Sequence, residues 1–228
     1  MLLIFANEAD HKAKTLVESW RDYNARLLTI QDLSKPGWSH DKCQGKPSFV
    51  AEGEQINLDQ VHGIFSRVRC VTEEDLGHIV EEDRLYVINE MTAFILDWLC
   101  RAPFTVLNRP TVGSLIGAAY SHERWLSLAS KTGLKLNCSH KTYPPQDKKD
   151  WPSIIPVTVI GSRWFGDVDD ELGQQAVKLA KAVPIELLTV MFDDADATAS
   201  FVSADPMIDI EQPQIAEALL ERLRKGVQ

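Results

Sequence analysis

The chain has 228 residues, of which 44% are hydrophobic and 25% charged, as expected for a soluble globular protein of one large or two small domains. Its formal net charge of −9 argues against a general nucleic-acid binder, which would carry a basic field. The start, MLLIFANEAD, lacks the basic segment of a secretory signal, and no apolar run is long enough to span a membrane. We therefore expect a cytoplasmic protein without nucleic-acid or membrane partners.

Four cysteines are scattered along the chain without CxxC spacing: Cys43, Cys70, Cys100 and Cys138. Reduced thiols in a cytosolic protein account for them. His40 with Cys43, and Cys138 with His140, are weak metal half-sites in polar loops. Zinc sites need two such pairs, so we expect no metal.

The N-terminal region predicts a βαβ opening of a parallel sheet. The turn after its first strand, Asn7 to Asp10, is acidic and has no GxGxxG, which makes a nicotinamide dinucleotide site improbable. The expected elements are a strand at 2–6, a helix at 12–24, a strand at 26–30, a small hairpin at 49–58 and a third core strand within 61–71.

The third strand carries two arginines at its end, Arg67 and Arg69. Residues two apart on a strand share one face, and guanidinium groups are well suited to grip phosphate or carboxylate. The alternative is a solvated pair that faces the acidic runs at 73–75 and 81–83.

A long amphipathic helix is predicted from apolar residues that recur at helical spacing between Ile79 and Leu99. The pattern predicts a wide buried face and an end near Cys100. Glu90 lies in the middle of this helix, where it either anchors Arg67 or Arg69 as an ion pair or orients a substrate amine.

The helix leads into a short strand, 104–107, which ends in Asn108, Arg109 and Pro110. Proline cannot donate to a sheet, so the strand stops with a polar edge. The carboxyl ends of strands in open α/β sheets are where ligands bind, which makes Asn108 and Arg109 candidates for ligand contacts.

The second half of the chain predicts a helix, a polar interval and a new set of strands. The expected elements are a helix at 118–132 capped by Gly133, a strand at 134–138, an exposed linker at 139–152, a hairpin at 154–166, a helix at 171–181, strands at 186–192 and 201–204, and a final helix at 215–225.

This order of segments resembles the RimK-like ATP-grasp ligases, particularly the group that modifies ribosomally made peptides. The segments that carry the likeness are FSRVRC, NEMTAFILDWL, VLNRP, SHERWLSLASKTGL, VTVIGSRWFGD, ELLTVMF, FVSADP and ALLERL. The resemblance implies an α/β protein with a parallel-sheet pre-ATP-grasp (Rossmann-like) domain at 1–138, a linker at 139–153 and a smaller α+β portion at 154–228. It also implies a ligand site formed by Arg67, Arg69, Glu90, Asn108 and Arg109.

The chain differs from this family at segments and positions that the family uses for catalysis. Such a ligase would insert its nucleotide-gripping subdomain between Leu134 and Ile154, where this chain has only a proline-rich interval. The family's magnesium ligands fall at Met191, Ser203 and Asp205, and a methionine cannot ligate magnesium. The remaining aspartates nearby form either a substitute carboxylate cluster with Asp205 or a solvated acidic turn: Asp193, Asp194 and Asp196.

Three functions remain open from the sequence. The first is a degenerate ATP-grasp-like protein, non-catalytic alone and without a cofactor, that binds a small anionic ligand, a peptide or a partner protein. The second is an active ATP-dependent carboxylate–amine ligase of the peptide type with a shortened grasp, the one hypothesis that requires ATP and magnesium. The third is a structural or oligomeric assembly subunit, suggested by tryptophans in or beside loops: Trp38, Trp151 and Trp164.

Overall fold

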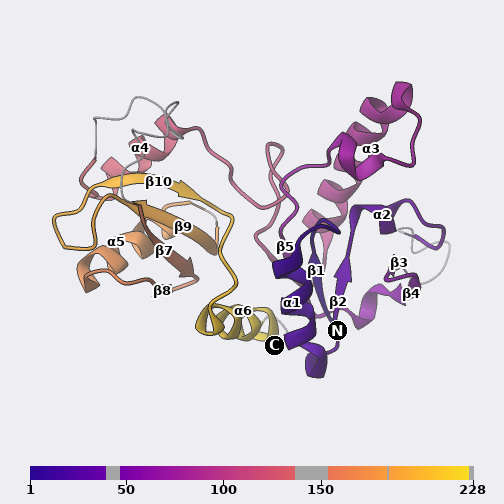
Figure 1. The fold of residues 1–228 in the computed structure, drawn as a ribbon, viewed down its shortest axis with the longest axis horizontal. Helices are drawn as coiled ribbons and strands as arrows, with labels where there is room; N and C mark the ends of the chain where they lie inside the picture. Colours follow the sequence, from indigo (N-terminus) through magenta and orange to yellow (C-terminus); the bar gives the residue numbers. More distant parts are fainter. Residues whose placement is uncertain (40–46, 137–153, 184, 226–228) are drawn as a thin grey trace. The chain divides into compact units, whose positions relative to one another are not determined.

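The computed structural model describes residues 1–39, 47–136, 154–183 and 185–225. The chain forms two compact units, one made of residues 1–117 with the end of the chain from Leu220, the other of residues 118–219. Each unit contains a four-stranded sheet and its own hydrophobic core (Figure 1). The linker expected at 139–153 lies outside the described residues, so the domain limits expected from the sequence stay a prediction.

Unit 1 is built on a parallel sheet with the strand order β2-β1-β5-β6. Its strands are short and largely buried: β1 (Leu2–Phe5), β2 (Ala25–Leu28), β5 (Gly63–Ser66) and β6 (Thr105–Leu107). A separate antiparallel hairpin pairs β3 (Ser48–Ala51) with β4 (Glu54–Asn57), as predicted. The predicted N-terminal parallel sheet is therefore confirmed.

The helical segments of unit 1 are α1 (His11–Ser19), η1 (Arg21–Tyr23), α2 (Ile30–Leu33), η3 (Leu58–Gln60), η4 (Glu73–Leu76) and α3 (Glu81–Arg101). Two predicted boundaries were wrong. The helix expected at 12–24 ends at Ser19, and the chain then turns through Asn24, which has a left-handed φ of 53°. The strand expected at 26–30 ends at Leu28, because Thr29 and Asp32 form a capping box that starts α2.

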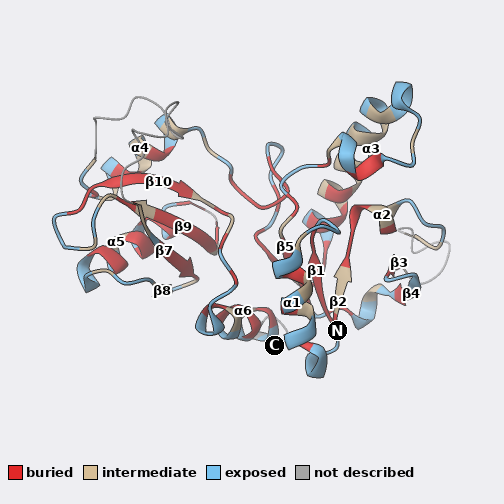
Figure 2. Ribbon diagram, viewed as in Figure 1, coloured by how far each residue is buried: buried red, intermediate tan, exposed pale blue. Residues whose placement is uncertain are grey.

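Most of the apolar face predicted for α3 packs on the core, with Ile88, Met91 and Phe94 partly buried against it, but the first turns of the helix extend beyond it. Ile95, Trp98 and Leu99 are buried, whereas Leu85 near the other end is 68% exposed (Figure 2). The reason is length. A helix of 21 residues extends for about 31 Å, whereas the three- and four-residue strands span only about 13 Å.

Unit 2 contains an antiparallel sheet with the order β10-β9-β7-β8. Its elements are α4 (His122–Lys131), β7 (Ile155–Ile160), β8 (Arg163–Phe165), α5 (Asp170–Lys181), β9 (Leu187–Phe192) and β10 (Phe201–Asp205), followed by α6 (Pro213–Lys225), whose last turns count with unit 1. Most of these match the predicted elements within a few residues. The strand expected at 134–138 is reduced to one parallel bridge between Leu136 and Phe201, and the positions after Leu136 are outside the described residues.

Two of the tryptophans singled out from the sequence pack within their own units. The ring centroid of Trp38 lies 5.4 Å from those of Phe94 and Trp98. Trp164 lies directly against Gly173 of α5, where a Cβ atom would come within 2.2 Å of the indole. Local packing therefore accounts for both side chains, while Trp151 lies outside the described residues.

Within the described ranges, none of the helices combines the length and apolarity that crossing a membrane requires. Cys70 and Cys100 are free and exposed. The other two cysteines and the weak half-sites with His40 and His140 lie outside the described residues.

Candidate functional site

The parallel sheet of unit 1 has a switch point between β1 and β5. The chain continues from β1 to β2 on one side and from β5 to β6 on the other. Phe5 is in register with Ser66, so the loop after β1 and the segment after β5 leave the sheet side by side. Crevices at such points, outside the carboxyl ends of the strands, are where open α/β sheets bind ligands. We use the name β1/β5 crevice for the ends of these two strands with the residues that follow them, from Ala6 to Asp10 and from Ser66 to Arg67.

An ion pair joins the two segments that leave the sheet at the β1/β5 crevice. Arg67 Nε donates to Asp10 Oδ2 at 2.7 Å, and the side chains are only 9% and 20% exposed. The other carboxylate oxygen of Asp10 accepts from the backbone N–H of Ala13 at 3.0 Å, which caps α1. Burial on its own would raise the pKa of Asp10, but the hydrogen bonds from Arg67 and Ala13 and the charge of Arg67 outweigh it and hold the pKa below its ordinary value.

Two buried side-chain oxygens at this end of the sheet have no hydrogen-bond partner among the described residues. One is Oγ of Ser66, the last residue of β5, whose side chain is almost fully buried. The other is Oε1 of Gln31, just after β2, whose Nε2 donates to the carbonyl of Asp75 at 3.3 Å. A buried polar atom without a partner costs about 1–3 kcal/mol, so a water molecule or a ligand group that bonds these oxygens would be stabilising.

Arg109 has a structural role at the end of α3. Its guanidinium donates to four backbone carbonyls at 3.0–3.4 Å: Leu99, Cys100, Ala102 and Phe104. A cation that bonds the last carbonyls of a helix satisfies acceptors that the helix cannot pair and complements its dipole. Asn108 is buried and donates through Nδ2 to the carbonyl of Ile116 at 3.2 Å. Both side chains fix the passage from α3 through β6 to the following loop.

The five residues predicted as a ligand site therefore fall in different surroundings. Arg67 lies in the β1/β5 crevice, whereas Arg69 is exposed two residues further on, with its carbonyl accepting from the N–H of Leu115 at 3.0 Å. The argument that Arg67 and Arg69 share a strand face was wrong, because β5 already ends at Ser66. Glu90 is exposed on α3, and Arg67 pairs with Asp10 rather than with Glu90.

Sequence reasoning missed three members of this region: Asp10, Gln31 and Ser66. The acidic turn that contains Asp10 was noted as an argument against a dinucleotide, without a link to any arginine. Its position directly after β1 could have suggested a partner for an arginine after a neighbouring parallel strand. Neither Gln31 nor Ser66 gives a sequence signal, because an unpartnered oxygen becomes visible only once its neighbours are placed.

In unit 2, strands β9 and β10 bring together the positions where ATP-grasp ligases are expected to hold magnesium. Met191 lies directly opposite Ser203, and Asp205 lies opposite Thr189. Asp205 Oδ1 accepts from the N–H of Met207 at 2.8 Å. Among the described residues, no group of three or more His, Cys, Asp or Glu side chains is placed to hold a metal ion. A thioether, a hydroxyl and the single carboxylate of Asp205, one oxygen of which already accepts from Met207, are a poor match for the oxygen shell that Mg²⁺ requires.

The aspartates between β9 and β10 serve the turn itself. Asp193 Oδ1 accepts from the N–H of Ser200 at 2.6 Å, and Asp196 Oδ1 accepts from the N–H and hydroxyl of Thr198 at 2.7 Å. The hydrogen bonds from Thr198 lower the pKa of Asp196, which keeps this carboxylate charged. These contacts favour the acidic-turn interpretation over a substitute metal cluster.

No protein-family model matches the chain, and neither does any curated protein sequence. Solved structures do match. The macrocyclase MdnC from Microcystis aeruginosa MRC, bound with precursor peptide MdnA, has a TM-score of 0.69 at 11% identity, over 97% of this chain and 98% of that chain. The ATP-grasp ligase PsnB, complexed with a minimal precursor, has a TM-score of 0.69 at 12% identity, over 100% and 99%.

A third similar structure is the Chryseobacterium gregarium RiPP-associated ATP-grasp ligase in complex with ADP and a leader and core peptide. Its TM-score is 0.66 at 10% identity, over 98% of this chain and 96% of that chain. Together these likenesses show that the chain has an ATP-grasp-like α/β fold, as the sequence predicted.

The Asp10–Arg67 pair generates a test of its contribution to stability. Asp10→Asn keeps the helix cap, because asparagine caps as well as aspartate, but it removes the charge that Arg67 faces. We expect the variant to lose about 2 kcal/mol of unfolding free energy at pH 7. Since the folded pKa of Asp10 is lowered, its stabilising effect is fully present above the unfolded value of about 4 and is lost as the pH falls through the folded pKa.

Urea denaturation of both proteins at a series of pH values from 7 down to about 2 measures this difference. The curves of wild type and Asp10→Asn should converge only below pH ~4. Asp22→Asn, an exposed carboxylate in η1, serves as the charge-matched control and should follow wild type throughout. A gap between wild type and Asp10→Asn that is absent at pH 7, or unchanged at the lowest pH, contradicts the assignment.

Proposed function

We propose that this protein is an ATP-grasp-fold binding protein whose β1/β5 crevice takes a small molecule or peptide through a carboxylate. The observation that carries the proposal is the Ser66 hydroxyl, which is buried at the end of β5 without a partner among the described residues. A ligand carboxylate would accept from this hydroxyl, beside the guanidinium of Arg67, whose charge Asp10 already balances. The precursor peptides present in structures of similar fold support the peptide form of this ligand.

We further propose that the chain transfers no phosphate on its own. The support is the opposed pair Met191 and Ser203, which leaves Asp205 as the one carboxylate at the three expected magnesium positions. The proline-rich interval after Leu134 would also be too short for a nucleotide-gripping subdomain, although much of it lies outside the described residues. The likeness to the ligases spans nearly the whole of their chains and does not itself support such a loss. The non-catalytic proposal therefore depends on Met191 and Ser203.

Replacing Ser66 by alanine tests the binding proposal with two readouts of opposite sign. Removing an unpartnered buried hydroxyl should raise the unfolding free energy by about 1 kcal/mol. The same change should weaken binding of succinate or of the peptide acetyl-Gly-Glu at least about fivefold in titration calorimetry, because it removes a donor to the carboxylate.

Ser48→Ala is the matched control for this test. Ser48 is also buried, but its hydroxyl donates to the carbonyl of Gly37 at 3.0 Å and accepts from Gln55 at 2.9 Å. Its replacement should lower the unfolding free energy by about 1 kcal/mol. If Ser66→Ala loses stability as Ser48→Ala does, or if neither carboxylate probe binds wild type, the crevice is not a carboxylate site.

The competing function is an active ATP-dependent carboxylate–amine ligase, which the similar fold of peptide-modifying ligases favours. Calorimetry with ATP and Mg²⁺ separates the two. We expect no binding in the micromolar range, because the oxygens that would place the metal on the phosphates are missing. Micromolar nucleotide binding, or ADP release that depends on an added acid and amine, would establish the ligase and overturn the non-catalytic proposal.

An assembly role is favoured by a different observation, the exposed end of α3. Leu85 and Tyr86 are each 68% exposed there, and Val80 just before the helix is 62% exposed (Figure 2). Neighbouring exposed apolar side chains on one helix end mark contact surfaces more often than isolated ones do.

Light scattering at two protein concentrations tests the assembly role. If α3 mediates self-association, wild type is larger than a monomer, and Leu85→Glu with Tyr86→Glu restores the monomer mass. The control is Val112→Glu, an isolated loop residue that is 93% exposed and should leave the mass unchanged. A monomeric wild type at both concentrations removes self-association as a function.

A further inference from the structure

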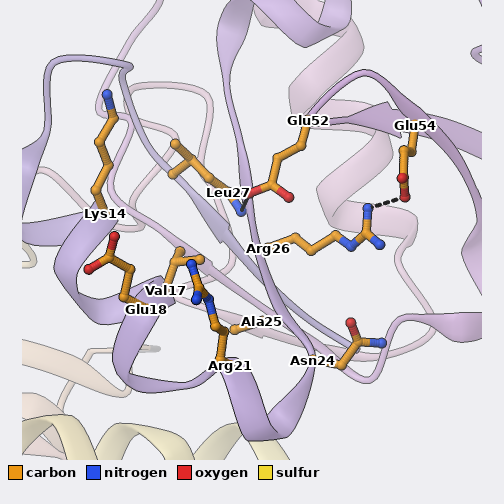
Figure 3. A pocket seen from close by; sticks show the side chains of 10 residues that line it. All are labelled: Lys14, Val17, Glu18, Arg21, Asn24, Ala25, Arg26, Leu27, Glu52 and Glu54. Carbon is orange, nitrogen blue, oxygen red and sulfur yellow. Dashed lines mark hydrogen bonds and ion pairs between the residues drawn. The ribbon is translucent and has the colours of Figure 1, made fainter.

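Unit 1 contains a second hollow, away from the β1/β5 crevice, along the outer edge of β2. It has a volume of about 540 Å³ and lies between α1, the edge strand β2 and the tip of the β3–β4 hairpin (Figure 3). Its floor includes the apolar side chains of Val17 and Leu27. A four-residue edge strand at the bottom of a hollow is a place where another strand can pair.

The hydrogen bonds between β1 and β2 identify which backbone groups of β2 face away from β1. Leu2 N donates to Asn24 O at 3.2 Å, and Ala6 N donates to Leu28 O at 3.0 Å, so the even-numbered residues turn their backbone groups toward β1. Backbone groups alternate along a strand, so Ala25 and Leu27 turn theirs away from β1; the N–H of Ala25 donates to the carbonyl of Trp20 at 3.4 Å, which leaves Leu27 as the N–H at the hollow.

A side chain occupies the position where a neighbouring strand would bond. The N–H of Leu27 donates to Oε1 of Glu52 at 3.2 Å. Glu52 comes from the hairpin tip, and its carboxylate reaches across the hollow to the strand edge (Figure 3). An oxygen acceptor at this N–H is what the backbone carbonyl of a paired strand would supply.

The conformation of Glu52 indicates that this contact is specific. Glu52 and Gly53 are the two central residues of the hairpin turn, with φ of 52° and 79°. Two positive φ values define a turn in which asparagine or glycine is strongly preferred at the first position. A glutamate held there is an outlier, and such outliers persist where a contact of the side chain depends on them.

The charges around the hollow select an extended peptide over a small anion. Lys14 and Arg21 line one side with Glu18, and Arg26 pairs with Glu54 on the other. With Glu52, the hollow carries three cations and three anions. A balanced set gives no net attraction for an isolated anion, whereas it can meet side chains of both signs on a strand that also bonds through its backbone.

We propose that the β2 edge is a peptide-docking site, at which an extended peptide of mixed charge adds a fifth strand to the sheet of unit 1. One peptide carbonyl replaces the Glu52 carboxylate on the N–H of Leu27, and the peptide's charged side chains lie between α1 and the hairpin tip. Glu52 is then a built-in competitor that covers the edge when no peptide is bound. This site is independent of the carboxylate site proposed at the β1/β5 crevice.

The test uses a fluorescein-labelled probe, acetyl-Thr-Lys-Val-Glu-Thr-Val-amide, with fluorescence anisotropy and ¹⁵N-edited NMR. Glu52→Asn removes the competing carboxylate while it keeps a residue that favours the turn, so it should bind the probe at least about fivefold tighter than wild type. The Leu27 amide resonance should shift on binding. Glu74→Asn is the control, because it makes the same change at an exposed position outside the hollow.

Two further arms separate the alternatives. A probe with N-methylated backbone amides cannot pair as a strand and should not bind, and Ser66→Ala should bind the original probe as wild type does, whatever its effect on succinate. Equal affinity of wild type and Glu52→Asn, an unmoved Leu27 resonance, or displacement of the probe by succinate at its own binding concentration would each overturn the edge-strand proposal.

Discussion

The ion pair between Asp10 and Arg67 is the contact on which the ligand side of unit 1 depends. It closes the switch point between β1 and β5, and the same carboxylate caps α1 through Ala13. Three elements are therefore fixed by one side chain. Both partners are mostly buried, so removing either charge leaves the other without compensation, which costs more than the pair gains in a solvated setting. Ser66, directly before Arg67, is held at this point with no partner for its hydroxyl among the residues that the structure describes.

The fold was accessible from the sequence because its signals are local. Short apolar runs predicted the parallel strands, and helical spacing predicted α3, α5 and α6 within a few residues. The predictions that failed depended on which elements lie next to one another in the folded chain. The spacing of α3 could not reveal that Leu85 lies beyond the short strands, and nothing near Thr29 distinguished a continuing strand from a capping box. Elements follow from periodicity, whereas burial depends on the size of the partner they meet.

The candidate site was only partly accessible for the same reason. Arg67 was found from its residue type and its place after a strand, but its partner lies 57 positions earlier in the chain. Arg109 was found by the same logic and proved to bond the carbonyls at the end of α3. An arginine after a strand can face a ligand or a helix end, and its type does not distinguish the two. In unit 2, the sequence predicted the two strands that contain Met191 and Ser203, but only the structure shows that these residues lie opposite each other.

The polar groups at the carboxyl end of the unit 1 sheet differ from those at its outer edge, β2, in whether they have a hydrogen-bond partner. At the carboxyl end, buried oxygens of Ser66 and Gln31 have no hydrogen-bond partner in the part of the chain that the structure describes, and a group that bonds them would offset the cost of burying them. At the outer edge of β2, the N–H of Leu27 already has a partner, which comes from a glutamate in an unfavourable backbone conformation. Under the two proposals, an unpaired hydroxyl favours binding of a carboxylate at the carboxyl end, whereas the Glu52 side chain competes with a peptide at the β2 edge. Both proposed sites belong to the sheet of unit 1, so neither requires a metal ion at the positions of Met191 and Ser203 in unit 2.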